Sequence, residues 1–125
     1  TPLCWSAFNG NFPMTKLLVK HGALVNVTDK QGRTPLYLSC GWGSGDSGVE
    51  VTNFLISNGA DVDKPTTDGW TALYFCAFRG KPQAVKLLIN SQADVLKADK
   101  MNRTALEIAK SRKHKDIVSM LENHG

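Results

Sequence analysis

The chain has 125 residues, of which 42% are hydrophobic and 21% are charged, and its formal net charge is +4. These values are ordinary for a globular domain, and the longest apolar runs are too short to span a bilayer, so we expect no membrane insertion. The net charge is modest, and the basic residues late in the chain are interrupted by acidic ones, which argues against nucleic acid as a partner.

A three-residue motif, Thr-(Pro/Ala)-Leu, recurs along the chain at steps of 33, 37 and 33 residues. It begins at Thr1, Thr34, Thr71 and Thr104. A fixed period near 33 residues indicates a stack of one small supersecondary unit, because a unit of this length cannot bury its own apolar face. We therefore divide the chain into four repeats at about 1–33, 34–70, 71–103 and 104–125.

Within each repeat the pattern predicts a short helix, a tight turn, an antiparallel helix and an extended finger. In the third repeat Thr71 suits a helix cap, Gly80 a left-handed helix end, and Pro82 the start of the second helix. The prediction is eight helices in four antiparallel pairs, with three β-turn fingers and no sheet. The second helices should turn an apolar stripe inward, formed by Leu17, Leu18, Leu55, Ile56, Leu88, Ile89, Val118 and Leu121.

The first repeat has no finger before it and carries the apolar residues Trp5, Phe8 and Phe12. We interpret this as an array that extends upstream, in a chain that is a fragment of a larger protein. The second repeat is four residues longer than the others. The surplus falls in the glycine-rich segment 41–48, which we predict to be a flexible loop. Its Trp42 either folds back into a groove or is offered to a partner, unless the segment is only a tolerated insertion.

The third and fourth repeats depart from the pattern at single positions. Asn102 stands where the earlier fingers have Gly32 and Gly69, and Asn best tolerates the positive φ of that turn. Gln92 replaces the glycine that ends the second helix in the earlier repeats, so this end should be strained or longer. Residues 104–125 are more polar and are typical of a terminal cap.

The repeated segments resemble the ankyrin repeat, and the resemblance covers the whole chain. The matching segments include TPLYLSC, TALYFCAFRGKPQAVKLLI, DKQGRTPL, NGADVD and TALEIAKSRKHKDIVSML. It implies an all-α solenoid of antiparallel helix pairs with β-turn or hairpin fingers. It also implies a protein–protein interaction module with a concave groove. The usual histidine of the first helix is replaced by Cys4, Tyr37, Tyr74 and Glu107, which puts its hydrogen bond in doubt.

The resemblance assigns partner-binding positions to the finger tips and to the exposed side of each first helix. The candidates are Arg33, Trp70, Met101 and Arg103 on fingers, and Phe8, Trp42, Phe78, Arg79 and Arg112 on helices. Trp and Arg are typical of binding hot spots, and we expect Trp70 to lie near Arg79 and Arg103. Such a surface suits an acidic and apolar segment of a partner protein. Asn26 is a candidate for asparaginyl hydroxylation, although a purely structural role is the stronger interpretation.

No catalytic, cofactor-binding or metal-binding constellation rises above chance, so we expect a protein that is not an enzyme. Cys4, Cys40 and Cys76 are odd in number and are interpreted as reduced core residues, which favours the cytoplasm, with the nucleus as the alternative. We expect a monomer in isolation. The alternative function is a structural or targeting segment that packs within a larger multi-domain protein, such as an enzyme, a channel or a ligase adaptor.

Overall fold

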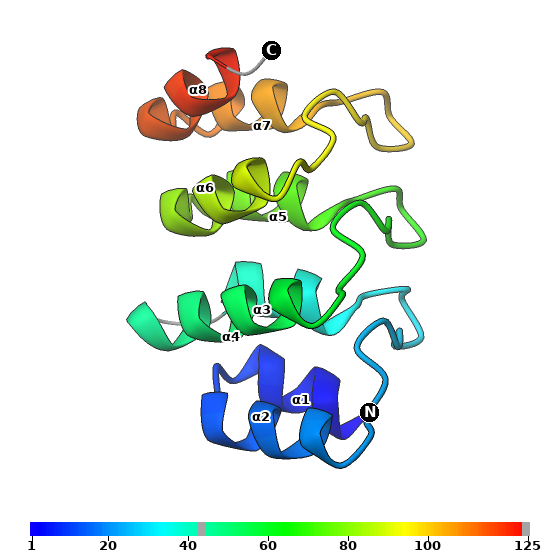
Figure 1. The fold of residues 1–125 in the computed structure, drawn as a ribbon. Helices are drawn as coiled ribbons and strands as arrows, with labels where there is room; N and C mark the ends of the chain where they lie inside the picture. The colour runs from blue at the N-terminus through cyan, green and yellow to red at the C-terminus, as the bar shows by residue number, and fades with distance from the viewer. Residues whose placement is uncertain (43–44, 124–125) are drawn as a thin grey trace.

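Four antiparallel helix pairs stack in one row in the computed structural model, which describes residues 1–42 and 45–123, without the side chains of 42 and 45–47 (Figure 1). The first helices of the pairs are α1 (Pro2–Phe8), α3 (Pro35–Trp42), α5 (Ala72–Arg79) and α7 (Ala105–Ser111). The second helices are α2 (Phe12–Lys20), α4 (Gly45–Ser57), α6 (Pro82–Asn90) and α8 (Lys115–Glu122). The described part contains no strand. The predicted all-α solenoid is therefore confirmed.

Each first helix begins at the threonine that opens its repeat. The hydroxyl of this threonine accepts a hydrogen bond from the backbone N–H three residues later, which satisfies a donor that the helix itself leaves unpaired. The four capping residues are Thr1, Thr34, Thr71 and Thr104. In α7 the cap is reciprocal, because the Glu107 carboxylate accepts from the backbone N–H of Thr104 at 3.2 Å.

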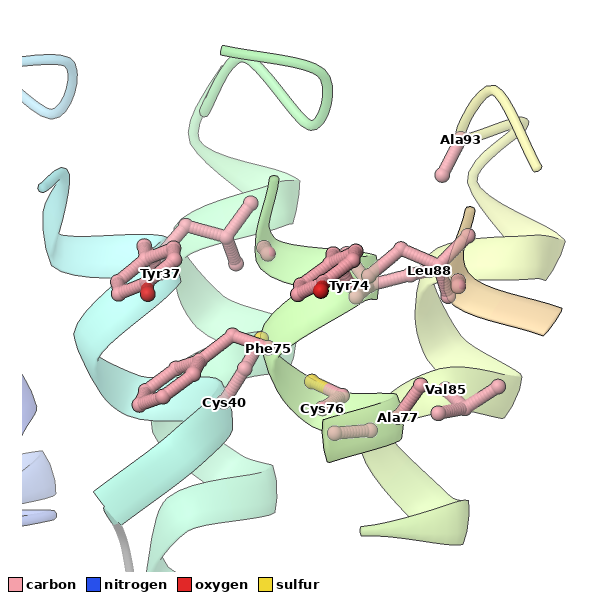
Figure 2. Close-up of a cluster of buried hydrophobic side chains, with 14 of the residues drawn as sticks. Tyr37, Cys40, Tyr74, Phe75, Cys76, Ala77, Val85, Leu88 and Ala93 are labelled. Carbon is pink, nitrogen blue, oxygen red and sulfur yellow. The ribbon is translucent and has the colours of Figure 1, made fainter. Parts of the chain in front are cut away.

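The core runs along the row between the helix layers, where Leu55, Leu88 and Leu121 of the second helices are buried (Figure 2 shows its central part). The predicted inward stripe is right in these repeats and wrong at Leu17, whose exposed fraction is 49%. Leu17 lies on α2, at the end of the row, where no helix pair covers it. Each first helix packs against the first helices of neighbouring repeats, so the fold is a chain of nearest-neighbour interfaces.

The two helices of the first repeat are joined by a buried hydrogen bond between the Ser6 and Thr15 hydroxyls, at 3.0 Å. The second repeat has the same bond between Ser39 and Thr52, at 2.9 Å. The third repeat has Cys76 and Val85 at these positions, and the fourth has Ala109 and Val118. The connection between the two helices is thus polar in one half of the row and apolar in the other.

The predicted loop over residues 41–48 is wrong for most of its length. Helix α3 continues to Trp42 and α4 begins at Gly45; residues 43–44 and the Trp42 side chain lie outside the described residues. Gly41 lies within α3, and this position requires glycine because the Phe75 ring of the next repeat occupies the space into which a side chain would project. Gly48 lies inside α4, and its carbonyl accepts a hydrogen bond from the Thr52 hydroxyl at 2.8 Å. The surplus residues mainly lengthen a helix.

Three residues other than glycine have a left-handed backbone in the part of the chain that the structure describes. Asn102 has φ of 63°, close to the 76° and 82° of Gly32 and Gly69, so the prediction for this turn is confirmed. Gln92 has φ of 66° after a helix of ordinary length, so this helix end is strained and not extended. Lys113 has φ of 62° at the position that Gly80 fills in the preceding repeat. Strain at Lys113 was not predicted.

Candidate binding surface

The three fingers repeat one backbone geometry. The first residue of each turn donates its N–H to the carbonyl of the fifth, at 3.0 Å for Asp29 and Arg33, 2.9 Å for Thr66 and Trp70, and 2.8 Å for Asp99 and Arg103. Successive fingers are also bonded to one another. The N–H of Thr67 donates to the carbonyl of Gln31 at 3.1 Å, and the N–H of Lys100 to that of Asp68 at 3.2 Å. The finger tips therefore form a row with fixed spacing along one side of the stack (Figure 1).

The outer two fingers are closed by an ion pair between their first and fifth residues. Arg33 Nε lies 2.7 Å from Asp29 Oδ2, and Arg103 NH2 lies 3.0 Å from Asp99 Oδ2. Burial alone would raise the pKa of each aspartate, but hydrogen bonds from the arginine backbone and guanidinium outweigh it and lower both pKa values. These arginines are thereby held within their own fingers.

The middle finger has Thr66 and Trp70 in place of the aspartate and arginine. The Trp70 indole, half-buried, packs on aromatic rings of α5: its centroid lies 4.9 Å from Tyr74 and 5.6 Å from Phe78. Phe75 extends the group and stacks on Tyr37 of α3, with centroids 4.4 Å apart and planes 3° apart. We call these five residues the aromatic cluster: Tyr37, Trp70, Tyr74, Phe75 and Phe78.

A cavity of about 280 Å³ opens between the first and middle fingers, beside the aromatic cluster. Its lining combines aromatic rings with the polar groups of the fingers. The lining residues are Gln31, Arg33, Tyr37, Thr66, Asp68, Trp70 and Phe75. The sequence did not identify Tyr37 and Phe75 as parts of this surface. The replacement of the usual histidine by Tyr37 was the signal that could have indicated it.

Three arginines near the aromatic cluster have different partners, and the predicted proximity of Trp70 to Arg79 and Arg103 stays a prediction. The guanidinium carbon of Arg112 lies 4.3 Å above the centre of the Phe78 ring, which is a cation–π geometry. Arg79 donates from Nε to the Gly41 carbonyl at 3.3 Å, and Arg103 is held by Asp99. The structure therefore brings Trp70, Phe78 and Arg112 together in one surface, with the Arg112 guanidinium over the Phe78 ring at the edge of the aromatic cluster.

The remaining candidates lie around this surface or away from it. Met101, on the tip of the third finger, is largely exposed, and Phe8 is partly exposed on α1. Arg33 contributes to the cavity wall while it stays paired with Asp29. The Trp42 side chain is outside the described residues.

Two tyrosines of the cluster have altered acidity. Burial raises the pKa of Tyr37, and burial together with the Asp99 carboxylate raises the pKa of Tyr74 to about 12. The buried Tyr74 hydroxyl has no hydrogen bond of standard length and angle, so its interaction with the Asp99 carboxylate is electrostatic. Both hydroxyls are therefore neutral at physiological pH, and the cluster presents no anionic oxygen.

Asn26 connects two fingers. Its Oδ1 accepts a hydrogen bond from the backbone N–H of Asp61 at 2.7 Å, and its Nδ2 donates to the Gly59 carbonyl at 3.2 Å. Asp63, at the equivalent position one repeat later, accepts from the N–H of Asp94 at 2.8 Å. These bonds support the structural interpretation of Asn26, and its hydroxylation stays a prediction.

Within 1–42 and 45–123, no group of three His, Cys, Asp or Glu side chains is placed to hold a metal ion. Cys4, Cys40 and Cys76 are buried free thiols, and burial raises the pKa of the Cys76 thiol. No helix in this part of the chain has the length and apolarity needed to cross a membrane.

A family model of ankyrin repeats in three copies matches residues 1–64 and 44–125. Over 93% of its length the chain is 35% identical to XBAT34 of Arabidopsis thaliana, a protein named for E3 ubiquitin-protein ligase activity, and it spans 31% of that protein. It is 31% identical over its whole length to the palmitoyltransferase AKR1 of Lachancea kluyveri, of which it spans 17%. Over 74% of the chain the identity to protein phosphatase 1 regulatory subunit 12A of Mus musculus is 33%, across 8% of that subunit. The chain thus spans less than a third of each of these relatives.

Proposed function

This chain belongs to the ankyrin repeat family, whose repeats are protein–protein interaction modules, and on that premise we propose where and what it binds. The concave groove and finger tips hold a segment of a partner protein, and the contact centres on Trp70, Phe78 and Arg112. The segment carries an acidic residue next to a bulky apolar one. The observation that carries this proposal is the middle finger, where a half-buried indole replaces the ion pair that closes the other two fingers.

Each half of the proposed segment has a matching group on the surface. A bulky apolar side chain would cover the Trp70 indole and enter the adjoining cavity, where it would bury area at little cost in rotamer entropy. Arg112 uses one face of its guanidinium on Phe78, which leaves its N–H edge for a carboxylate. Arg79, at the end of α5, adds positive charge that would raise the rate at which the partner segment associates.

The test is selection of peptides from a random display library on the immobilised chain, followed by titration of the selected peptides. We expect enrichment of Asp or Glu beside Leu, Ile, Phe or Trp. Replacing Trp70 by alanine should weaken binding by about 1–2 kcal/mol, roughly five- to thirtyfold. Trp5→Ala is the matched control, because it removes an exposed indole that lies outside the groove.

The result that would contradict this proposal is equal affinity for the wild type and the Trp70→Ala/Arg112→Gln double variant. Binding would then lie elsewhere on the chain. The titrations should be run at two salt concentrations, because an arginine contact with a carboxylate predicts weaker binding at higher salt, mainly through a slower association rate.

A second candidate is a structural or targeting segment that packs against other parts of a larger protein. The relatives favour it, because the chain spans only a part of each. The two proposals differ in solution: a surface made to be covered within one protein should cause self-association when it is exposed. We propose that the isolated chain is a monomer that works in the cytoplasm or nucleus, where its three buried thiols would stay reduced. Sedimentation velocity of the isolated chain tests whether it is a monomer.

A further inference from the structure

Two of the three cysteines are neighbours in the core, on helices of successive repeats. Cys40 lies on α3 and Cys76 on α5, and their exposed fractions are 2% and 0%. Figure 2 shows the sulfur atoms of both residues in the space between these two helices. Burial raises the pKa of the Cys76 thiol, and the Cys40 thiol raises it further, so the two groups are close enough to interact. The core thus contains a dithiol that spans the second and third repeats.

Helices α3 and α5 approach each other closely beside this dithiol. Gly41 follows Cys40, and the space where a Gly41 side chain would project is filled by the ring of Phe75, the residue before Cys76. The residue after Cys76 is Ala77, which is small and fully buried. A disulfide forms only where the β-carbons of two cysteines lie about 4 Å apart, so it needs a close approach of this kind.

The third cysteine has a different neighbour. The Cys4 thiol, on α1, donates to the carbonyl oxygen of Arg33 at 4.0 Å. The equivalents of Cys4 in the next two repeats are Tyr37 and Tyr74, so Cys4 occupies a position of the aromatic cluster and not one of the dithiol. Of the three pairings that three cysteines allow, the structure therefore favours one.

We propose that Cys40 and Cys76 form an oxidative modification site, at which a hydroperoxide converts the two thiols into a disulfide between the second and third repeats. One thiol, ionised to the thiolate, attacks a peroxide oxygen; the O–O bond breaks, an alcohol leaves, and the sulfur becomes a sulfenic acid. The second thiol attacks this sulfur, so that the S–S bond forms and the hydroxyl group leaves as water. The two thiols lose two electrons and two protons, and the hydroperoxide is reduced to alcohol and water.

The disulfide suits this part of the core better than the other product of two thiols, a complex with a thiophilic metal ion. Both cysteines belong to the hydrophobic core cluster, and a disulfide is neutral and apolar like its surroundings. Two thiolates on a monovalent ion such as Cu(I) would leave a net negative charge in this core, which is costly to bury.

Burial determines how the site reacts. The Cys76 thiol has a raised pKa and no exposed surface, so the closed structure protects it from an oxidant in water. The row is held by interfaces between neighbouring repeats, and such an interface can open without complete unfolding of the chain. Oxidation therefore proceeds through openings between α3 and α5, and closure brings the sulfenic acid back against the second thiol.

The disulfide would join the two helices that form one wall of the cavity between the first and middle fingers. Tyr37 of α3 and Phe75 of α5 both line this cavity, and Phe75 is adjacent to Cys76 in the chain. Once the disulfide has formed, the interface under the cavity can no longer open. Amide hydrogen exchange in α3 and α5 should then be slower than in the reduced chain.

The experiment uses the wild-type chain, whose cysteine spacing supplies an internal control. Cys40 is 36 positions from Cys4 and 36 positions from Cys76, so loop closure favours neither pairing in an unfolded chain. The reduced chain is treated with hydrogen peroxide, folded in buffer or unfolded in urea, and the remaining thiols are alkylated. Cleavage before the aspartates places the three cysteines on separate peptides, 1–28, 29–45 and 68–93, and mass spectrometry identifies the linked pairs.

In the folded chain we expect the Cys40–Cys76 disulfide to exceed the Cys4–Cys40 disulfide by at least about tenfold, whereas the unfolded chain should form the two in similar amounts. Folded Cys76→Ala is the matched control: it keeps a pair with the same spacing, Cys4 and Cys40, and should form little disulfide. Folded Cys4→Ala should form the Cys40–Cys76 disulfide as the wild type does.

The oxidised wild type should unfold at a urea concentration about 1–2 M higher than the reduced chain, because the disulfide restricts the unfolded ensemble. Three results would overturn the proposal. The folded chain could form both disulfides in equal amounts, it could form none under conditions that oxidise the unfolded chain, or the oxidised chain could unfold at a lower urea concentration than the reduced one.

Discussion

Replacing Gly41 by alanine tests how tightly successive repeats are packed. In an isolated helix this change should stabilise by about 1 kcal/mol, because alanine has the higher helix propensity. In this structure a Cβ on Gly41 would overlap Cε2 and Cδ2 of Phe75 and would lie 2.8 Å from its Cζ. The propensity and the packing therefore predict effects of opposite sign.

The size of the expected change in the free energy of unfolding follows from the surroundings of the Phe75 ring. The ring is 6% exposed, and it is stacked on Tyr37 at 4.4 Å, so it cannot turn away without disturbing the aromatic cluster. Inserting a methyl group into such a core costs roughly 2–3 kcal/mol. After the gain in helix propensity of about 1 kcal/mol, we expect Gly41→Ala to destabilise the chain by about 1–2 kcal/mol.

Urea unfolding followed by far-UV circular dichroism measures this free energy for four proteins: the wild type, Gly41→Ala, Phe75→Leu and the double variant. Leucine lacks the Cε2 and Cζ atoms that would meet a Cβ on Gly41, and its Cδ atoms can rotate away, so the alanine should be better tolerated when Phe75 is replaced. The double-mutant cycle should then show a coupling energy of about 1–2 kcal/mol. A Gly41→Ala chain that is as stable as the wild type, or more stable, would refute the reasoning about this interface.

Three further predictions concern strain, acid sensitivity and modification. Lys113→Gly should raise the free energy of unfolding by about 1 kcal/mol in urea titrations, because it relieves a left-handed lysine; a decrease would show that the side chain has a stabilising contact. The pKa of Asp99 lies below 3.8 in the folded chain, so the unfolded chain binds more protons near pH 4 and stability should fall as the pH drops below about 4. Asp99→Asn should flatten this dependence in thermal melts between pH 3 and pH 6, and an unchanged slope would assign the acid sensitivity to other carboxylates. Treatment with an ankyrin-directed asparaginyl hydroxylase should add one oxygen at Asn26 by intact-mass and peptide analysis, and no added mass would remove the idea.

The repeat architecture could be predicted from the sequence because its signals are local and occur more than once. The opening threonines cap their helices as the pattern requires, and the Asn102 turn has the backbone that its glycine equivalents have. Periodicity placed Leu88 and Leu121 in the core. It failed at Leu17 because helical periodicity identifies the apolar face of a helix but does not show whether a neighbouring element covers it.

The segment 41–48 was misread because glycine has two different uses. Its frequency there suggested a loop, whereas Gly41 is needed in a helix because another residue occupies the space of its side chain. That contact joins residues from different repeats, and nothing in the local sequence indicates it. The same limit applies to the binding surface: Trp70 was identified from its position on a finger, but the pairing of Arg112 with Phe78 depends on how two repeats are stacked.

The polar and apolar helix connections described above imply that the two halves of the row respond differently to cold. Apolar contacts such as those of Val85 weaken on cooling, because the hydrophobic effect near room temperature is mainly entropic. The hydroxyl pair of Ser39 and Thr52 does not depend on that effect to the same degree. Near 0 °C the third and fourth repeats should therefore lose more of their stability than the first two. Amide hydrogen exchange recorded at two temperatures would show this as a protection gradient along the row whose slope changes with temperature.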